Sequence, residues 1–311
     1  MDTIKKLRQK AKKDLKTIVL PESEDKRIRQ AAEIVEEEGI AKVLLLSQDK
    51  IDSKEKERYI QEFYERYKNK GFDIERVKTL FEDPMYYAAM MTKEAKVDGL
   101  VAGATHTTPE VARCCIRCLG VDEESKFISS CFIMVVPDCS YGEAGTFIFA
   151  DCGIIPEPSA LQLACISLSA ARLAREVLEI KPRIALLSYS TKSSEETASN
   201  KKIRQALQLI KEMAPELLVD GELQVDSAIV PEVARIKYPD SVLKGRANIL
   251  IFPDLEAGNI SYKLVQRLAN ARAVGPLFLG LKRPASDLSR GCLVEDIVDC
   301  IAVTAIRAKV Y

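Results

Sequence analysis

The strongest constraint on the fold is a repeated alternation of short apolar runs with helical patterns. TIVL (17–20) is followed by a helical pattern over 28–38, and KVLLL (42–46) follows that pattern at once. The same order recurs with a helical pattern over 54–70 and the apolar run DGLVAGA (98–104). Continuous apolar strands that alternate with helices are typical of a mainly parallel sheet covered on both faces. The sequence therefore predicts an α/β fold.

The pattern changes near residue 130, where a second domain is expected to begin. The apolar runs CFIMVVP (131–137) and TFIFADC (146–152) are joined by a turn-rich segment, which is typical of an antiparallel hairpin or of two neighbouring strands. Further apolar runs at 183–188, 248–252 and 275–280 each lead into a polar loop. A chain of 311 residues is long enough for two domains.

Residues 160–180 form a helical pattern that is apolar on more than one face. Such a helix must be covered, either by other layers of the same chain or by a second subunit. The sequence leaves both interpretations open.

Net charge and hydropathy argue against nucleic acid and membranes as partners. Lys and Arg number 46 and Asp and Glu number 46, so the formal net charge is zero and gives no electrostatic reason to expect nucleic acid or an acidic membrane. No run reaches the roughly 18 apolar residues of a transmembrane helix, and no apolar signal core follows the basic start. We therefore expect a cytoplasmic protein.

The chain has a single histidine, which argues against zinc hydrolases and other His-based metal centres. A Ser-His-Asp triad would need His106, and no G-x-S-x-G motif supplies its nucleophile. The nine cysteines are scattered and are expected to be reduced thiols. Cys115 and Cys118 form one CxxC, but no second pair follows at zinc-ribbon spacing, so no metal site is predicted.

Ligands of open α/β sheets bind beyond the carboxyl ends of strands, and four polar loops lie at such places. In the first, residues 103–113, Thr108 is expected to cap a helix that starts at Pro109, whose free amides would attract an anion; Arg113 follows one turn later. An ordinary capped helix is the alternative. In the second, residues 188–194, several hydroxyls surround Lys192 and could bind phosphate, although the glycine spacing of a Walker loop is missing.

The third loop, residues 252–267, leads into a helix on which Lys263 and Arg267 stand four residues apart, and two such cations are commonly just solvated. The fourth, residues 283–296, places Ser289 and Arg290 shortly before two acidic residues in the first turn of the last helix. A carboxylate there either compensates the helix dipole or acts as a base beside an arginine that holds an anion. No G-x-G-x-x-G occurs, so a nicotinamide site is disfavoured.

PASDLSRGC, FPDLEAGNISYKLVQRL, SYSTKSS, DGLVAGATHTT and TIVLPESEDKR together resemble the phosphate acetyltransferase (phosphotransacetylase) family, in the family's order and over essentially the whole chain. The resemblance implies the short form of the family, with two α/β domains, 1–128 plus 292–311 and 129–291, flanking an active-site cleft. It implies reversible acetyl transfer between CoA and phosphate by direct thiolate attack in a ternary complex. It also implies a homodimer, CoA as a substrate, no tightly bound cofactor and no metal.

Carried over residue by residue, the resemblance makes Asp296 the base for the CoA thiol, Arg290 the ligand of acetyl phosphate and Ser289 a donor to the oxyanion. The expected substrate-binding residues are Arg113, Arg267, Ser190, Thr191, Lys192, Thr107, Thr108, Asn259 and Lys263. One family arginine is replaced here by Tyr67, with Arg66 beside it.

Three alternatives stay open. A phosphate acyltransferase that prefers propionyl or butyryl groups differs by only about 1–3 kcal/mol per methylene in a pocket. A decarboxylating dehydrogenase has a related architecture, but the aspartate cluster that would bind its metal cannot be assigned here. A non-catalytic acetyl-CoA-binding module is disfavoured by the intact set of Ser289, Arg290 and Asp296.

Overall fold

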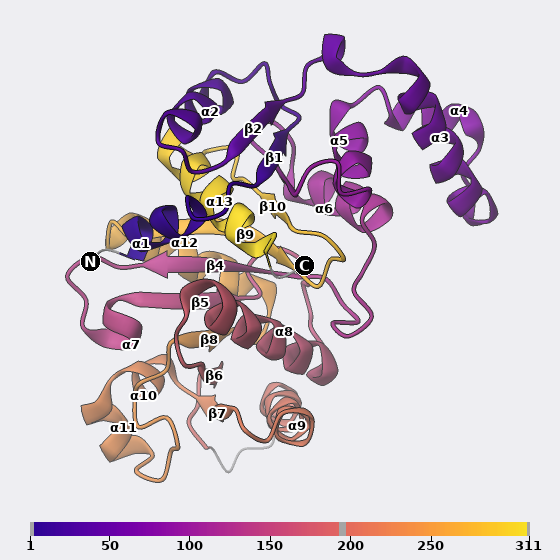
Figure 1. Ribbon diagram of the computed structural model, residues 1–311. Coiled ribbons are helices and arrows are strands. Elements are labelled where there is room, and N and C mark those ends of the chain that lie inside the picture. Colours follow the sequence, from indigo (N-terminus) through magenta and orange to yellow (C-terminus); the bar gives the residue numbers. More distant parts are fainter. Residues whose placement is uncertain (1–2, 193–196, 310–311) are drawn as a thin grey trace. The chain divides into compact units, whose positions relative to one another are not determined.

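The computed structural model describes residues 3–192 and 197–309, which form two compact units (Figure 1). Unit 1 comprises Met1–Val121 and Leu281–Tyr311, and unit 2 comprises Asp122–Gly280. The boundaries predicted at 128 and 292 differ from those in the structure. Residues 281–291 go with unit 1 because they contain a strand that pairs with the sheet of that unit.

The sheet of unit 1 is entirely parallel and has the order β2-β1-β3-β10. Its strands are β1 (Thr17–Leu20), β2 (Lys42–Leu45), β3 (Gly99–Ala102) and β10 (Ala285–Asp287). The first three were predicted, and the parallel pairing confirms the expected sheet type. The sequence analysis missed β10, because a three-residue strand that ends in Ser-Asp has no apolar run to reveal it.

Helices surround this sheet. They are α1 (Thr3–Ala11), α2 (Lys26–Glu37), α3 (Ser53–Tyr67), α4 (Ile74–Leu80), α5 (Pro84–Lys93), α6 (Thr108–Cys118) and α13 (Val294–Arg307), with short 3₁₀ segments at Gln48–Lys50 and Lys68–Lys70. Helix α13 packs against α1, α2 and β3, and every residue from Ile297 to Arg307 is buried. The C-terminal helix is therefore part of the core of unit 1.

The sheet of unit 2 has the order β9-β4-β5-β8-β6-β7. Its strands are β4 (Ser129–Val135), β5 (Thr146–Ala150), β6 (Arg183–Leu187), β7 (Leu218–Leu223), β8 (Ile249–Ile251) and β9 (Arg272–Leu279). Strand β4 is antiparallel to both β5 and β9, which confirms the expected hairpin, and the remaining pairs are parallel. Strand β7 was missed because its sequence, LVDGEL, carries two acidic residues.

The helices of unit 2 are α7 (Tyr141–Ala144), α8 (Ala160–Leu173) with a π-helical extension (Ala174–Leu178), α9 (Ala198–Met213), α10 (Val225–Ile229), α11 (Pro231–Lys237) and α12 (Leu255–Leu268). Helix α8 packs against strands of the sheet and against α9. Layers of the same unit therefore cover α8, as the core interpretation of residues 160–180 requires.

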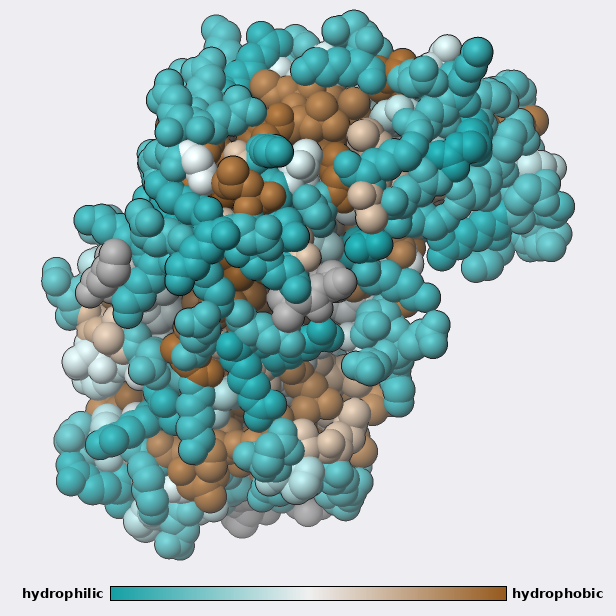
Figure 2. Space-filling model, viewed as in Figure 1, coloured by the Kyte–Doolittle hydropathy of each residue, from teal (hydrophilic) through white to brown (hydrophobic). Residues whose placement is uncertain are grey.

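Hydrophilic residues dominate the face of the molecule shown in Figure 2, in keeping with a charged fraction of 30%. Within residues 3–192 and 197–309, no helix has the length and apolar character needed to cross a membrane.

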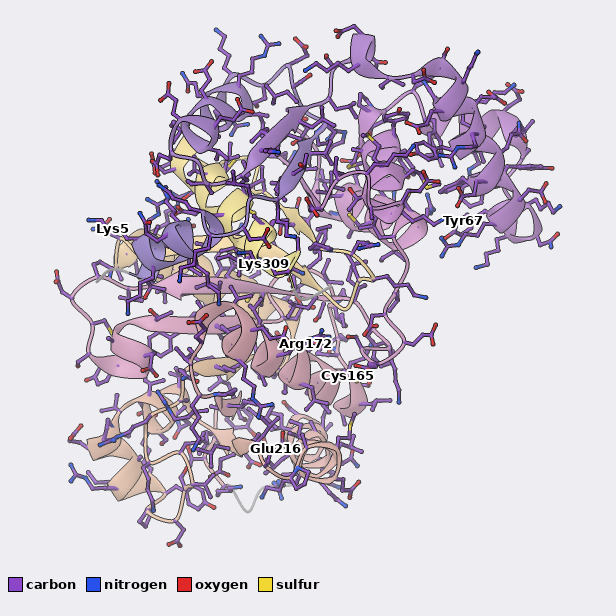
Figure 3. The ribbon with its side chains drawn as sticks, in the orientation of Figure 1. Lys5, Tyr67, Cys165, Arg172, Glu216 and Lys309 are labelled. Atoms are coloured by element: carbon purple, nitrogen blue, oxygen red, sulfur yellow. The ribbon has the colours of Figure 1, made fainter. Side chains whose placement is uncertain are left out.

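An aromatic cluster fixes the C-terminal end of α3 in unit 1. The Phe63 ring lies 4.6 Å from that of Tyr67 and 5.9 Å from that of Phe72, measured between centroids. Tyr67 is labelled in Figure 3. Its hydroxyl donates to the carbonyl of Arg117 on α6 at 3.0 Å. Tyr67 is thus a buried packing residue.

Candidate active site

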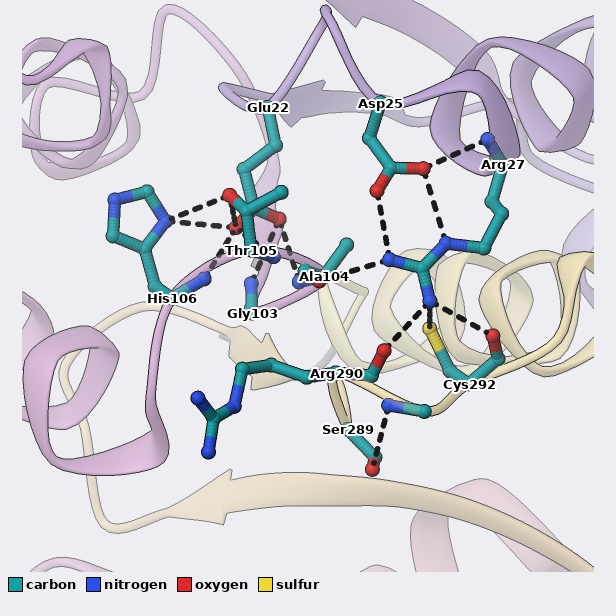
Figure 4. A network of polar contacts seen from close by, with 11 residues as sticks. Glu22, Asp25, Arg27, Gly103, Ala104, Thr105, His106, Ser289, Arg290 and Cys292 are labelled. Atoms are coloured by element: carbon teal, nitrogen blue, oxygen red, sulfur yellow. Dashed lines mark hydrogen bonds and ion pairs between the residues drawn. The ribbon is translucent and has the colours of Figure 1, made fainter.

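A buried carboxylate organises the carboxyl end of the unit 1 sheet (Figure 4). Glu22 follows β1 and accepts hydrogen bonds from the backbone amides of Gly103, Ala104, Thr105 and His106 at 2.9, 2.8, 2.8 and 3.1 Å. Burial alone would raise the pKa of Glu22, but hydrogen bonds from His106, Thr105 and Ala104 outweigh it and lower the pKa to about 2. Glu22 is therefore ionised, and it holds the whole turn between β3 and α6.

The single histidine bridges two carboxylates. The Nδ1 atom of His106 lies 2.7 Å from Glu22 Oε1, and its Nε2 atom lies 3.1 Å from Asp83 Oδ2. Hydrogen bonds to Asp83 and Glu22 raise the pKa of His106 to about 10, so the ring is an imidazolium at neutral pH. A protonated ring cannot take a proton from a nucleophile. This agrees with the absence of a predicted Ser-His-Asp triad.

Arg27 connects the β3–α6 turn to the loop that follows β10. Its Nη2 atom donates to the carbonyl of Ala104 at 2.9 Å and pairs with Asp25 at 2.7 Å. Its Nη1 atom donates to the carbonyls of Arg290 and Cys292 at 2.8 and 3.1 Å. Sequence reasoning did not assign roles to Glu22 or Arg27. The available signal was the charged segment ESEDKR, which directly follows a predicted strand.

The loop after β10 presents Ser289 and Arg290 at the surface. The carbonyl of Ser289 accepts from the amide of Cys292 at 2.8 Å, and its hydroxyl oxygen accepts from the amide of Gly291 at 3.3 Å. In the described part of the chain, no residue pairs with the guanidinium of Arg290, which extends away from the Arg27 contacts in Figure 4. An exposed guanidinium and a hydroxyl on one short turn can together bind an anion.

Asp296 lies in the first turn of α13, as predicted. Its Oδ2 atom accepts from the amide of Leu293, the residue before the helix, at 2.9 Å. This contact is the helix-start role that the sequence analysis gave as the alternative to a catalytic base. The other acidic residue of this turn, Glu295, pairs with Arg8 at 2.5 Å.

A second buried carboxylate supports the start of α6. The Thr108 hydroxyl donates to Asp287 Oδ2 at 2.5 Å, while Asp287 Oδ1 is buried and has no hydrogen-bond partner within residues 3–192 and 197–309. Burial raises the pKa of Asp287 to about 7. Gly103, with φ +113°, passes so close that a Cβ atom there would lie 2.1 Å from Asp287 Oδ1, so only glycine fits.

The predicted cap of α6 is wrong by one residue. Thr107, not Thr108, precedes the helix, and its amide and hydroxyl both donate to Glu110 at 2.8 Å. Pro109 is thus the second helical residue. The hydroxyls of both predicted substrate-binding threonines donate to carboxylates of the protein itself, and Arg113 is exposed on the same helix.

The predicted phosphate loop of unit 2 is largely held by β7 and its neighbours. The Nζ atom of Lys192 pairs with the buried Asp220 at 3.2 Å and also donates to the carbonyl of Gly221. The Thr191 hydroxyl accepts from the amide of Gln224 at 3.0 Å. The Ser190 hydroxyl lies 3.4 Å from the Oδ1 atom of Asn200. Residues 193 and 194 of the predicted loop lie outside the described residues.

Helix α12 carries the other predicted contacts of unit 2. The side-chain amide of Asn259 donates to the carbonyl of Cys152 at 3.0 Å, so it fixes the loop after β5. Lys263 and Arg267 are both exposed on one face, and the Lys263 Nζ atom lies 5.6 Å from the Tyr262 ring centroid. The expected site residues therefore fall into two sets, one in each unit.

The cysteines show no arrangement for metal binding. Cys114, Cys115 and Cys118 are buried, and burial raises the pKa of the Cys114 and Cys115 thiols. In the ranges 3–192 and 197–309, no group of three or more His, Cys, Asp or Glu side chains could hold a metal ion.

Proteins of known structure that resemble this chain in fold and sequence are phosphotransacetylases. The structure resembles a phosphotransacetylase from Streptococcus pyogenes, with a TM-score of 0.88, 33% identity and coverage of 99% of this chain and 98% of that one. It also resembles the EutD phosphotransacetylase from Staphylococcus aureus, with a TM-score of 0.84, 34% identity and coverage of 98% of each chain. Fold and sequence thus define an α/β acyltransferase.

Sequence comparison identifies the family. The sequence model described as "Phosphate acetyl/butaryl transferase" matches residues 2–305. Phosphate acetyltransferases from Acetivibrio thermocellus and Thermoanaerobacterium thermosaccharolyticum are 45% and 44% identical to the chain and cover 99% of it, and the alignments span 99% and 100% of those proteins. The chain belongs to the phosphate acetyl/butaryl transferase family, as its motifs suggested.

Proposed function

We propose that this enzyme interconverts acetyl-CoA plus phosphate with acetyl phosphate plus CoA. The observation that carries the proposal is the turn after β10, just before the helix that bears Asp296. This turn presents the Ser289 hydroxyl and the Arg290 guanidinium, which has no partner among the described residues. Family membership supports the proposal, since relatives named phosphate acetyltransferase match the chain over nearly its full length.

In the proposed reaction the CoA sulfur attacks the carbonyl carbon of acetyl phosphate. Asp296 takes the thiol proton as the C–S bond forms, because a free thiol with a pKa near 8.5 is mostly neutral at pH 7. The carbonyl oxygen becomes an oxyanion that accepts from the Ser289 hydroxyl. The bond between the acyl carbon and the bridging oxygen of the phosphate group then breaks, and phosphate leaves with that oxygen. Arg290 suits the phosphate because its guanidinium can donate two parallel hydrogen bonds.

The remaining predicted residues complete the proposal. Arg113 on α6 and Lys263 and Arg267 on α12 are exposed cations suited to the phosphates of CoA. We assign Lys192 a weaker role than the motif suggested, since Asp220 already neutralises it. We also propose a homodimer, a cytoplasmic location and CoA as a dissociable substrate rather than a bound cofactor.

A transferase that prefers butyryl groups is the second candidate, because the description of the matching family names both acyl groups. Thioester formation from acetyl, propionyl and butyryl phosphate, measured as kcat/KM for each, separates the two. We expect the largest kcat/KM for acetyl phosphate. A maximum at butyryl phosphate would favour the second candidate, and no thioester from any of the three would reject both.

The same assay tests the base. Asp296→Asn should lower kcat by about 10²–10⁴-fold while CoA binding stays within about threefold, because the amide keeps the acceptor oxygen for Leu293 but cannot take a proton. Glu295→Gln is the matched control on the same helical turn and should retain kcat. A near-normal kcat in Asp296→Asn would show that Asp296 is not the base and that its role is the hydrogen bond to the Leu293 amide at the start of α13.

A further inference from the structure

A continuous chain of hydrogen bonds runs from His106 to the backbone of Arg290 (Figure 4). His106 and the Ala104 amide both bind the Glu22 carboxylate. The Ala104 carbonyl accepts from Arg27, and Arg27 in turn donates to the Arg290 carbonyl. Each of these contacts lies within unit 1, so the chain does not depend on how the two units are arranged.

Glu22 is the centre of this chain. It is 6% exposed, and a buried carboxylate is costly unless its oxygens are satisfied. Its donors are four successive backbone amides, the Thr105 hydroxyl at 2.8 Å and the His106 ring. Because every donor belongs to residues 103–106, the carboxylate fixes the backbone of one turn. The same turn places the Ala104 carbonyl where it accepts a hydrogen bond from Arg27.

His106 neutralises the centre without exposing a ring nitrogen to a ligand. Glu22 and Asp83 each contact one of its two ring nitrogens. Glu110 and Asp287 also interact electrostatically with the ring. The histidine is thus a fixed cation that ties the segment after β1, the turn after β3 and the start of α5 together.

We propose that Glu22 and His106 are positioning residues for acyl transfer, which hold the turn of Ser289 and Arg290 in place through Ala104 and Arg27. The inference rests on the proposed function, in which Ser289 and Arg290 contact the substrate. Neither Glu22 nor His106 touches the reacting atoms in this account. A displacement of the turn lowers the rate because transition-state donors act only at hydrogen-bond distance.

The experiment compares Glu22→Gln with the wild type and with Glu24→Gln. Glu24 is a nearby carboxylate on the same segment whose side chain is 86% exposed, so its variant is a matched control for the change of charge. We expect Glu22→Gln to lower kcat about 10- to 100-fold while the KM for CoA changes less than about threefold. Glu22→Asp, which retains the carboxylate, should restore part of the lost kcat. Glu24→Gln should match the wild type.

The single histidine supplies an independent readout. Tag-free protein has one imidazole, so one NMR signal reports the protonation of His106. In the wild type this signal should not titrate between pH 5 and 8. Asp83→Asn should shift the titration to lower pH yet keep kcat within about threefold, because Glu22 still holds every amide of the turn and Asn also caps helices.

Two results would overturn the inference. One is a kcat of Glu22→Gln within about threefold of the wild type. The other is a fall in kcat matched by an equal fall in the number of CoA molecules bound per chain, which would show lost folded protein rather than a displaced turn. A wild type that forms no thioester would instead reject the proposed function, and the inference with it.

Discussion

At the scale of residues, unit 1 contains two buried carboxyl groups that differ in charge at neutral pH. Glu22 is ionised, whereas the pKa of Asp287 lies near 7, so that group is only partly ionised. Among the described residues, Glu22 receives six donors, whereas Asp287 receives the Thr108 hydroxyl at one oxygen and has no hydrogen-bond partner at the other; the Leu288 amide also lowers the pKa of Asp287, but burial outweighs both. Only Gly103 separates the two, because a side chain there would collide with Asp287. Charge state in this site therefore follows the supply of donors, since both carboxylates are buried.

The raised pKa of Asp287 gives the protein a defined pH dependence of stability. Its folded pKa of about 7 lies above the unfolded value near 3.9, so the folded state binds the extra proton. The wild type should lose stability relative to Asp287→Asn as the pH rises from about 4 to 7, by up to about 1.4 kcal/mol per pH unit, and the difference should stay constant above pH 7. Urea unfolding of both proteins at pH 4.5, 6 and 8 measures this. A difference independent of pH would contradict the assignment.

Sequence reasoning identified the exposed polar residues better than the buried ones. The SRG turn and Asp296 stand where they were expected. The roles of Glu22, Arg27 and Asp287 were not predicted, because a buried carboxylate in a short sequence segment looks like any surface acid. Its partners lie about 80 residues away or more, and only the fold brings them together.

At the scale of elements, β7 shows how a strand that the sequence pattern misses can contact a residue predicted to bind phosphate. Of the ten strands in the described part of the chain, apolar runs predicted eight, but the β7 sequence LVDGEL has acidic residues at positions 220 and 222. Both are buried, and they pair with Lys192 and Arg204. The loop that looked like a phosphate site is thus held by a strand that the sequence pattern could not reveal.

Lys192→Met tests whether Lys192 supports the structure or binds the substrate. We expect it to lower the free energy of unfolding by about 1–3 kcal/mol, less than for a fully buried pair because Lys192 is partly exposed, and to leave the KM for acetyl phosphate within about twofold. Asp220→Asn in the same chain should remove much of that cost, because no unpaired charge remains. Denaturant unfolding of the single and double variants gives the coupling. An increased KM for acetyl phosphate at an unchanged free energy of unfolding would show that Lys192 binds the phosphate group of the substrate.

At the scale of the whole molecule, the chain builds unit 1 from its two ends. Strand β10 pairs with β3, and α13 fills the core beside α1 and α2. The apolar pattern predicted an α/β fold with a second domain from about residue 130, and the return of the chain to the first domain was implied by the family resemblance. The point of return was misplaced, because β10 has no apolar run of its own.

A chain that stops after Gly280 should keep unit 2 folded and lose unit 1. Without β10 and α13, strands β1 and β3 lose the cover that α13 gives to one face, and α2 loses its packing against α13, while unit 2 is continuous from Asp122 to Gly280. Hydrogen exchange followed by mass spectrometry should show strong protection in β4, β5 and β6 and little in β1 and β3. Equal protection in both units would contradict the division.

The same connectivity sets an order of events during synthesis. The ribosome makes residues 122–280 before the segment that completes unit 1, which at about 5–20 residues per second takes on the order of ten seconds or more. Until then β3 has an unpaired edge, and the apolar face of β1 and β3 that α13 covers stays exposed. During this interval the N-terminal part of unit 1, Met1–Val121, is the part of the nascent chain most prone to aggregate or to bind chaperones. The turn of Ser289 and Arg290 forms only after the interval ends.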